Sequence, residues 1–206
     1  MRLLSQSLIV KTMGLVILTI ASNTVLAKPS VKEKYEVLKQ AKNYAQSVAC
    51  ATTFDDDNQG HKTTINDIHL IESQMDFSEK NEVGTQYLVY WGGDWGCSGG
   101  SGTYSSFLTS FNRFSETRPF LVEKMDVLED VNEDTYQINT RFIEDVKFLN
   151  GVFLITSSDY SDNNTDGGNN FPRYQYLYTV IYNDSSDTWK LANKKLLKDN
   201  YPNSKR

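Results

Sequence analysis

The chain has 206 residues, of which 39% are hydrophobic and 23% are charged, and its formal net charge at pH 7 is −5. This length suits one domain with a sizeable core. The acidic balance argues against a nucleic-acid partner, because affinity for a phosphate backbone needs clustered positive charge.

The first residues are typical of a secretory signal peptide. Arg2 and Lys11 are the only charged residues before and around an apolar run at positions 13–21, and small residues end at Ala27. The run is about half as long as the roughly 20 residues that a membrane helix needs. We therefore predict a signal peptide at 1–27, a single globular domain at 28–206, no membrane anchor after cleavage, and a periplasmic or secreted location.

The helix expected in the mature chain begins after Ser30. Ser30 and Glu33 have the spacing of a capping box. Apolar residues then recur at intervals of three and four, as on one face of a helix: Val31, Tyr35, Leu38, Ala41, Ala45 and Val48. This helix should end at Cys50.

Cys50 and Cys97 are the only cysteines of the chain. In an oxidising compartment two cysteines are expected to pair. A Cys50–Cys97 bridge would stabilise the fold by roughly 4 kcal/mol in the chain-entropy model. We predict this disulfide, which makes Cys97 a structural residue and not a nucleophile.

The segment after Cys50 gives weaker signals. Positions 51–64 are polar and rich in turn residues, and Asp55–Asp57 is typical of a solvated turn. Positions 64–75 fit either a strand or a short helix.

Everything after Thr85 favours β-structure, because Tyr, Phe, Val, Ile and Thr dominate short runs bounded by Gly, Asn and Asp. The continuous apolar run at 85–91 indicates a strand buried on both faces. Asn150-Gly151 suits a type I′ hairpin turn, and a second hairpin should join 173–182 to 188–197. We predict an α+β fold in which the N-terminal helix packs on a mainly antiparallel β-sheet.

The stretch from Trp91 to Tyr104 contains six of the twelve glycines. It matches the G-x-S-x-G pattern of a nucleophile elbow around Ser98. However, that fold places its histidine after the serine, and His61 and His69 both precede it. Residues 101–114 also favour a strand where an elbow needs a helix. Phosphate-binding glycine motifs do not fit either, so we do not expect Ser98 to be catalytic.

Two interpretations of the glycine-rich stretch remain open. In one, Trp91 and Trp95 belong to the core or support the disulfide. In the other, Trp91, Asp94 and Trp95 form a binding surface, because the indole faces suit a sugar ring or a partner's side chain.

The same stretch resembles a pattern, W-x-G-D-x-G-C-x-G-G-S-G-T, of uncharacterised bacterial exported proteins. A later S-D-Y segment, here Ser158 to Tyr160, and a Pro-x-x-Tyr-like stretch, here Phe171 to Tyr174, resemble the same group. The resemblance implies export and a common fold, and it implies no activity. The group often carries a later cysteine pair near Asn169 that this chain lacks, so no second disulfide is implied.

Metal binding is predicted at one place only. Two histidines and two paired cysteines do not favour zinc. Asp162, Asn164 and Asp166 have the spacing of oxygen ligands in the first half of a calcium loop, and Gly167 follows them. Arg173 stands where the bidentate glutamate belongs, so we predict at most weak calcium binding, with a polar hairpin loop as the alternative.

These observations favour a non-catalytic binding or accessory protein of the bacterial envelope, whose partner is another envelope or secreted protein. One specific form is an inhibitor or immunity protein for a cell-wall hydrolase. The first alternative is a carboxylate-dependent hydrolase, which needs two acids converging in a cleft. The second is a carbohydrate-binding module, which needs Trp91 and Trp95 coplanar at the surface.

Overall fold

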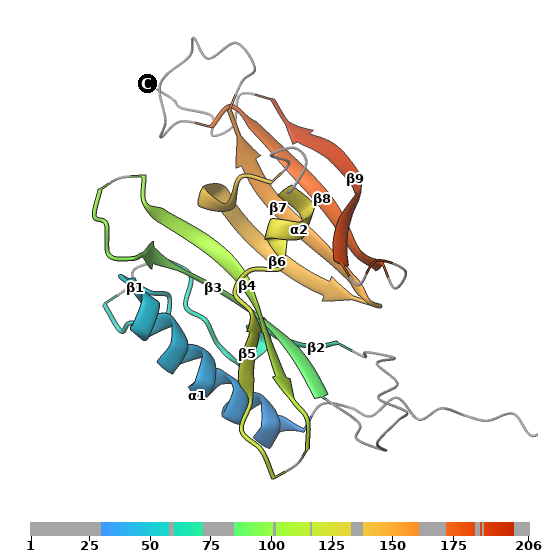
Figure 1. The fold of residues 1–206 in the computed structure, drawn as a ribbon. Coiled ribbons are helices and arrows are strands. Elements are labelled where there is room, and N and C mark those ends of the chain that lie inside the picture. Colours follow the sequence, from blue (N-terminus) through green and yellow to red (C-terminus); the bar gives the residue numbers. More distant parts are fainter. Residues whose placement is uncertain are drawn as a thin grey trace, which may run out of the picture.

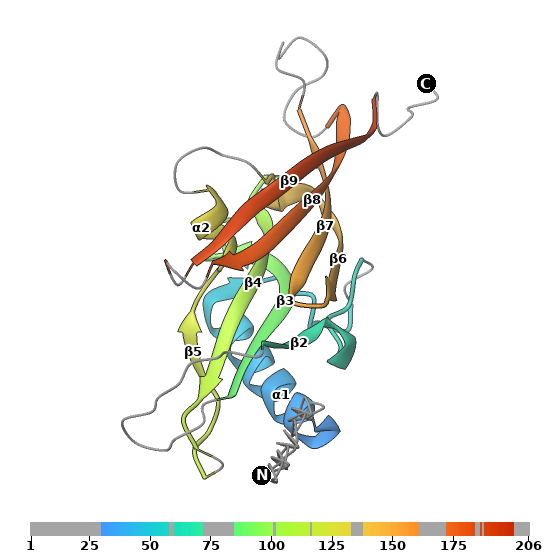
Figure 2. The same ribbon diagram turned by 90° about the vertical axis from the view of Figure 1, so that its right-hand side faces the viewer.

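Two antiparallel sheets and one long helix make up the ordered framework (Figures 1 and 2). The computed structural model describes residues 30–57, 60–71, 85–100, 102–115, 117–132, 138–160, 172–183, 186 and 188–199. In these ranges sheet A contains β1 (Ala49–Cys50), β2 (Ile68–Ile71), β3 (Thr85–Trp95), β4 (Tyr104–Arg113) and β5 (Leu121–Lys124). Sheet B contains β6 (Ile143–Leu149), β7 (Val152–Asp159), β8 (Tyr174–Asn183) and β9 (Thr188–Lys198). The helical elements are α1 (Val31–Val48), the short α2 (Leu128–Asn132), and the 3₁₀ turns η1 (Ile65–Asp67) and η2 (Thr140–Phe142).

The N-terminal helix, the antiparallel pairing and the disulfide agree with the prediction, but the fold is mainly β and has two sheets where one was expected. The reason lies in β3. Its residues from Tyr87 to Gly93 are all buried, so both faces of sheet A need a cover. Helix α1 covers one face, and sheet B with α2 covers the other.

The two faces of β3 contribute to two separate cores. Tyr87, Val89 and Trp91 pack in the cluster that includes α1. Leu88 and Tyr90 pack in the cluster between the sheets, which contains residues of β7, β8, β9 and α2. The prediction of a strand buried on both faces is therefore confirmed.

Helix α1 packs on sheet A through a face that is rotated from the one the sequence predicted. Ala41 and Ala45 are fully buried as expected, and so is Val37. The predicted apolar stripe is wrong at its first two positions, because Val31 is 63% exposed and Tyr35 is 57% exposed. The small alanine side chains let the helix lie close to the sheet, and this close approach selects the face that contains them.

The start of α1 is tied to sheet A by a charged cluster. The Ser30 hydroxyl accepts a hydrogen bond from the Glu33 backbone N–H at 3.5 Å, which is one half of the predicted capping box. The Glu33 carboxylate is bound by the Tyr87 hydroxyl at 3.0 Å and by the Arg113 guanidinium. Arg113 is almost fully buried and also lies 3.5 Å from the Glu36 carboxylate.

Both predicted hairpins are present in sheet B, whose strand order is β6-β7-β8-β9. Asn150 and Gly151 have φ angles of 51° and 78°, as a type I′ turn between β6 and β7 requires. Strands β8 and β9 form the second hairpin. The segment at 64–75, which the sequence left open, begins with η1 and then forms β2, up to the last described residue, Ile71.

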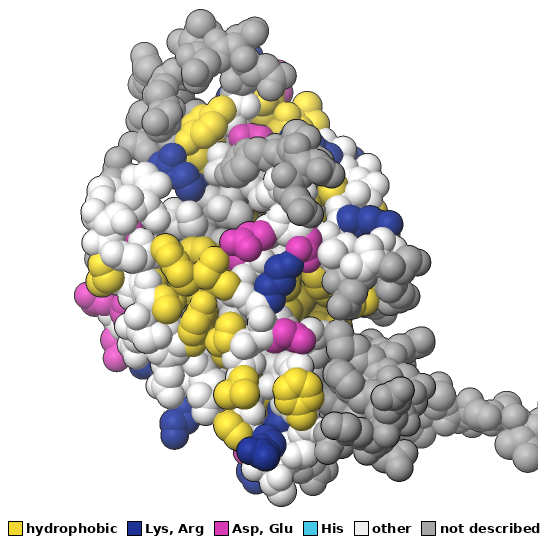
Figure 3. Space-filling model, viewed as in Figure 1, with side chains coloured by type: hydrophobic (Ala, Val, Ile, Leu, Met, Phe, Trp, Pro, Cys, Tyr) yellow, Lys and Arg dark blue, Asp and Glu magenta, His cyan; other side chains and the backbone are white. Residues whose placement is uncertain are grey.

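Strand β5 is an edge of sheet A and leaves Leu121 and Val122 exposed. Hydrophobic side chains gather over the course of β4 and β5 on the face of the molecule shown in Figure 3.

Candidate functional site

The glycine-rich stretch is the tight connection between β3 and β4, and the disulfide fixes it to the end of α1. Cys50 and Cys97 are bonded with a Cα–Cα distance of 5.0 Å, which confirms the predicted pairing. The Gly96 backbone N–H donates to the Val48 carbonyl oxygen at 2.9 Å. Gly96, Gly99 and Gly100 all have positive φ angles, so the turn needs glycine at these positions.

The two tryptophans of this stretch have different environments. Trp91 is fully buried, donates from Nε1 to the Thr109 hydroxyl at 2.7 Å, and stacks on Phe107 with a centroid distance of 4.6 Å. Its predicted membership of a binding surface is therefore wrong, because the large apolar ring fills the space between α1 and sheet A. Trp95, at the end of β3, is 37% exposed.

Asp94 organises the turn from within. Its Oδ2 accepts a hydrogen bond from the Gly99 N–H at 2.8 Å, and its carbonyl oxygen accepts one from the Cys97 N–H at 3.1 Å. Oδ1 is buried and has no hydrogen-bond partner among the described residues. Whether Asp94 and Trp95 contact a ligand stays a prediction.

Two threonines attach the loop after Cys50 to the edge of β3 that faces away from β4. Strands β1 and β2 pair with different parts of this edge. Between them, the Thr53 hydroxyl accepts from the Gly92 N–H at 3.0 Å, and the Thr53 N–H donates to the Gly92 carbonyl oxygen at 2.9 Å. The Thr63 hydroxyl bonds Thr53 at 2.7 Å and the Tyr90 carbonyl oxygen at 3.1 Å. The loop is thus held to the sheet by side chains where strand pairing is interrupted.

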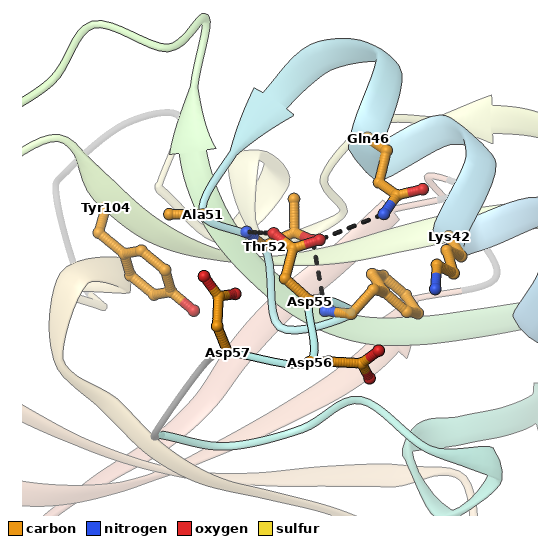
Figure 4. A pocket seen from close by; sticks show the side chains of 9 residues that line it. Lys42, Gln46, Ala51, Thr52, Asp55, Asp56, Asp57 and Tyr104 are labelled. Carbon is orange, nitrogen blue, oxygen red and sulfur yellow. Dashed lines mark hydrogen bonds between the residues drawn. The ribbon is translucent and has the colours of Figure 1, made fainter.

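The fixed loop forms one wall of an open depression of about 660 Å³ between α1 and the start of β4 (Figure 4). Its lining residues are Lys42, Gln46, Ala51, Thr52, Phe54, Asp55, Asp56, Asp57 and Tyr104. This volume lies in the range of ordinary ligand pockets. The depression is the candidate functional site.

Asp55 holds the wall in shape. Its carboxylate accepts hydrogen bonds from the Thr52 backbone N–H at 2.7 Å and the Gln46 amide at 3.2 Å. Partial burial acts to raise the pKa of Asp55, but these hydrogen bonds and the nearby Lys42 charge outweigh it, so the pKa is lowered. Asp55 is therefore a permanently charged structural group at neutral pH.

Asp57 and Tyr104 lie at the same end of the depression. In Figure 4 the Asp57 carboxylate points toward the Tyr104 hydroxyl, and Lys42 lies on the opposite wall. The carboxylates of Asp56 and Asp57 have no hydrogen-bond or ion-pair partner within the described chain. With three aspartates and one lysine, the lining has an excess of negative charge.

Gly92 gives Tyr104 its place. A Cβ at Gly92 would lie 2.7 Å from the Tyr104 hydroxyl oxygen and 3.0 Å from its ring. The hydroxyl end of the Tyr104 ring can therefore lie against β3 only because position 92 carries no side chain.

The residues of the rejected nucleophile elbow are not arranged for catalysis in this structure. Ser98 is exposed, and its hydroxyl donates to the Trp95 carbonyl oxygen at 3.4 Å. The segment that follows is strand β4, as predicted, and not a helix. His61 is partly exposed and lies 3.0 Å from Asp67; its hydrogen bond with this carboxylate outweighs burial and raises the pKa of His61.

The second histidine is packed against aromatic rings. His69 lies between the rings of Phe148 and Phe153, at centroid distances of 5.7 and 5.5 Å. Burial, together with the charge of Lys34, lowers the pKa of His69 to about 4.

A carboxylate with a raised pKa lies away from the depression. Burial raises the pKa of Asp126 to about 6, although its Oδ1 accepts from the Leu108 and Leu128 N–H groups at 3.0 Å each. These bonds join β4 to the start of α2, so Asp126 is a structural residue of the inner core.

The predicted calcium ligands Asp162, Asn164 and Asp166 lie outside the described residues. Within the described ranges, no group of three or more His, Cys, Asp or Glu side chains is arranged to hold a metal ion.

Comparison with known proteins returned no matching family model, no matching curated protein and no matching solved structure. Among the described helices, none is long and apolar enough to cross a membrane.

Sequence reasoning identified the disulfide and the glycine-rich stretch but missed the depression between them. One signal was present. Lys42 and Gln46 are one turn apart on α1, shortly before Cys50, so the bridge to Cys97 brings both the helix end and the following aspartates beside the β3–β4 turn. The contribution of Tyr104 depends on the β3–β4 register, which the sequence alone does not specify.

Proposed function

We propose that this protein is an exported, non-catalytic binding protein of the bacterial envelope or the extracellular space, and that the depression beside the disulfide is its binding site. The observation that carries the proposal is that the carboxylates of Asp56 and Asp57 have no partner among the described residues of a preformed depression, in which Asp57 points toward Tyr104.

The chemistry of the lining favours a cationic group from a partner protein. A guanidinium or ammonium group can pair with Asp57 and lie over the face of Tyr104, where the aromatic ring attracts a cation. Arginine is the better fit, because its planar head can do both at once. The proposed occupant is therefore an arginine side chain of another envelope or secreted protein.

The walls of the depression are held in place without a ligand, which favours a site that binds its partner without first having to fold. The disulfide, the Thr53 contacts with Gly92 and the bonds to Asp55 hold three parts of the wall. A preorganised site avoids the entropic cost of ordering a loop on binding. In one form of this proposal the partner is a cell-wall hydrolase, and this chain acts as its inhibitor or immunity protein.

A carboxylate-dependent hydrolase is the second candidate, because three aspartates line one depression. A glycosidase of that kind needs a general acid with a raised pKa, whereas the pKa of Asp55 is lowered. The binding function therefore fits the lining better. A sugar platform made from Trp91 and Trp95 does not fit, because Trp91 is buried.

The proposal is tested by titrating residues 28–206, in oxidised form, with Nα-acetyl-arginine amide and recording amide chemical shifts by NMR. Shifts should concentrate at residues 42–57 and at Tyr104. Nα-acetyl-citrulline amide, which has the same shape without the charge, should give much smaller shifts.

Two single variants give a matched comparison. Asp57→Asn removes a carboxylate from the depression, and Glu129→Gln removes one from the exposed surface of α2. The first should weaken binding of the arginine compound by roughly tenfold or more, and the second should leave it unchanged. Equal shifts from the citrulline compound, or full binding by Asp57→Asn, would contradict the proposal.

A further inference from the structure

The side of sheet B that faces away from sheet A carries aliphatic residues on its two central strands. In β7 and β8 the residues that enter the core between the sheets are Phe153, Ile155, Tyr178 and Val180. Because side chains alternate along a strand, the intervening positions lie on the outer face. They include Val152, Leu154, Leu177 and Ile181, all partly exposed.

No described element covers this outer face. Helix α2 and sheet A lie on the other side of sheet B (Figures 1 and 2). At one corner of the face Leu149 is 56% exposed. Partly exposed aliphatic residues that gather on one face of a sheet are typical of an interaction surface.

The two edges of the outer face differ in charge, because the charged outward residues of β9 are all lysines, whereas β6 carries Asp145 and Glu144 together with Lys147, which pairs with the outward Leu154. Along β9 the outward positions include Lys190, Lys195 and Lys198, opposite Ile181, Leu177 and Gln175 of β8. On β6, Asp145 pairs with Thr156 in the same cross-strand row as Lys195. Glu144 binds the side chains of Ser158 and Gln175, which puts it in the row of Lys198.

We propose that this face binds a second copy of the chain about a two-fold axis parallel to the strands. Such an axis reverses the order of the strands across the interface. It leaves each cross-strand row of residues at the same height along the strand direction in both copies. It therefore places β6 of one copy over β9 of the other, with Asp145 facing Lys195 and Glu144 facing Lys198. The aliphatic centres of the two faces meet between these charged edges.

Charge selects this axis over the alternative. A two-fold axis perpendicular to the strands would stack β9 on β9, which brings the lysines of the two copies together. The strand-parallel arrangement also agrees with the aligned packing of two twisted sheets. The Asp145 carboxylate already has Lys147 at 2.5 Å on its own strand, so it lies in a polar rim and not in the apolar centre.

The size of the face indicates a weak dimer. Four strands about 4.8 Å apart and about seven residues long, at about 3.4 Å per residue, make a face of roughly 19 by 24 Å. Two such faces bury on the order of 1,000 Å², at the lower end of specific interfaces. None of the residues lining the depression belongs to sheet B, so the binding site stays open in this dimer.

Sedimentation velocity over a range of protein concentrations measures self-association and so tests the proposal. The variants reverse the charge of one residue of the proposed Asp145–Lys195 contact. Lys195→Glu alone and Asp145→Lys alone should each weaken self-association by roughly tenfold or more, because each creates two like-charge contacts across the symmetric interface. An equimolar mixture of the two variants should dimerise again. In the mixed dimer the carboxylate introduced at position 195 faces the lysine introduced at position 145, and the unchanged Asp145 faces the unchanged Lys195.

The apolar centre provides a second variant. Leu154→Glu changes an outward-facing residue, so the monomer should keep its melting temperature while the dimer is lost. The proposal is overturned if the wild-type chain remains monomeric at millimolar concentration, if the charge variants associate as the wild type does, or if their mixture stays monomeric. Binding of anionic phospholipid vesicles by a wild-type chain that does not self-associate would also overturn it.

Discussion

Two buried titratable residues oppose each other in their effect on stability between pH 4 and pH 6.5. Asp126 has a pKa of about 6, above the value of 3.8 for a free aspartate, so between these two values the folded state binds this proton more strongly than the unfolded state and stability falls as pH rises. His69 has a pKa of about 4, below 6.5, so the unfolded state takes up the proton and stability falls as pH drops.

Asp126→Asn should separate these effects. The amide oxygen can still accept from Leu108 and Leu128, but the cost of burying a charge disappears. The variant should therefore gain about 2–3 kcal/mol relative to wild type between pH 4 and pH 7. Urea denaturation at pH 4 and at pH 7 measures the free energies of unfolding of the variant and the wild type. A difference between the two proteins that is the same at both pH values would contradict this prediction. His69→Phe should show the opposite trend, with its relative gain at low pH.

The sequence predicted the residues whose chemistry leaves few choices. Two cysteines in a chain predicted to be exported indicated the bridge, and Asn150-Gly151 indicated the turn, because few other residues adopt two positive φ angles. Trp91 and Trp95 could not be separated in this way. Both lie on the same face of β3 and both contact Phe107, but only Trp91 lies in the cluster that packs against α1.

At the scale of elements, α1 packs on sheet A through small apolar side chains along its length. One charged cluster at its start also binds it to the sheet. The sequence predicted the helix but not its rotation about its axis, since Ala41 and Ala45 belong both to the predicted stripe and to the face that is buried. The Glu33 contacts with Tyr87 and Arg113 add a long-range restraint that no local pattern reveals.

Glu33 and Glu36 give a matched test of this restraint, because both belong to the first turns of α1 and both approach Arg113. Glu33→Gln leaves the nearly buried guanidinium without its main carboxylate, so the free energy of unfolding should fall by about 2–3 kcal/mol. Glu36→Gln removes a half-exposed partner and should cost less than about 1 kcal/mol. Denaturant unfolding at neutral pH measures both, and equal losses would show that the cluster does not anchor the helix.

At the scale of the whole molecule, the chain forms three layers, with sheet A between α1 and sheet B. The apolar run at 85–91 predicted a strand covered on both sides, but it did not say by what. The β-rich second half of the chain was expected to extend the same sheet. Instead its hairpins pair with each other and form the cover, since β6 to β9 hydrogen-bond in sequence order.

The central claim is that the depression beside the disulfide receives a basic side chain of a partner protein. Immobilised residues 28–206 should retain a stoichiometric protein from an envelope extract. Nα-Acetyl-arginine amide should displace that protein, and the Asp57→Asn bait should fail to retain it while the Glu129→Gln bait retains it fully. Equal retention by the Asp57→Asn bait, or turnover of a glycan or peptide by the purified chain, would contradict the account.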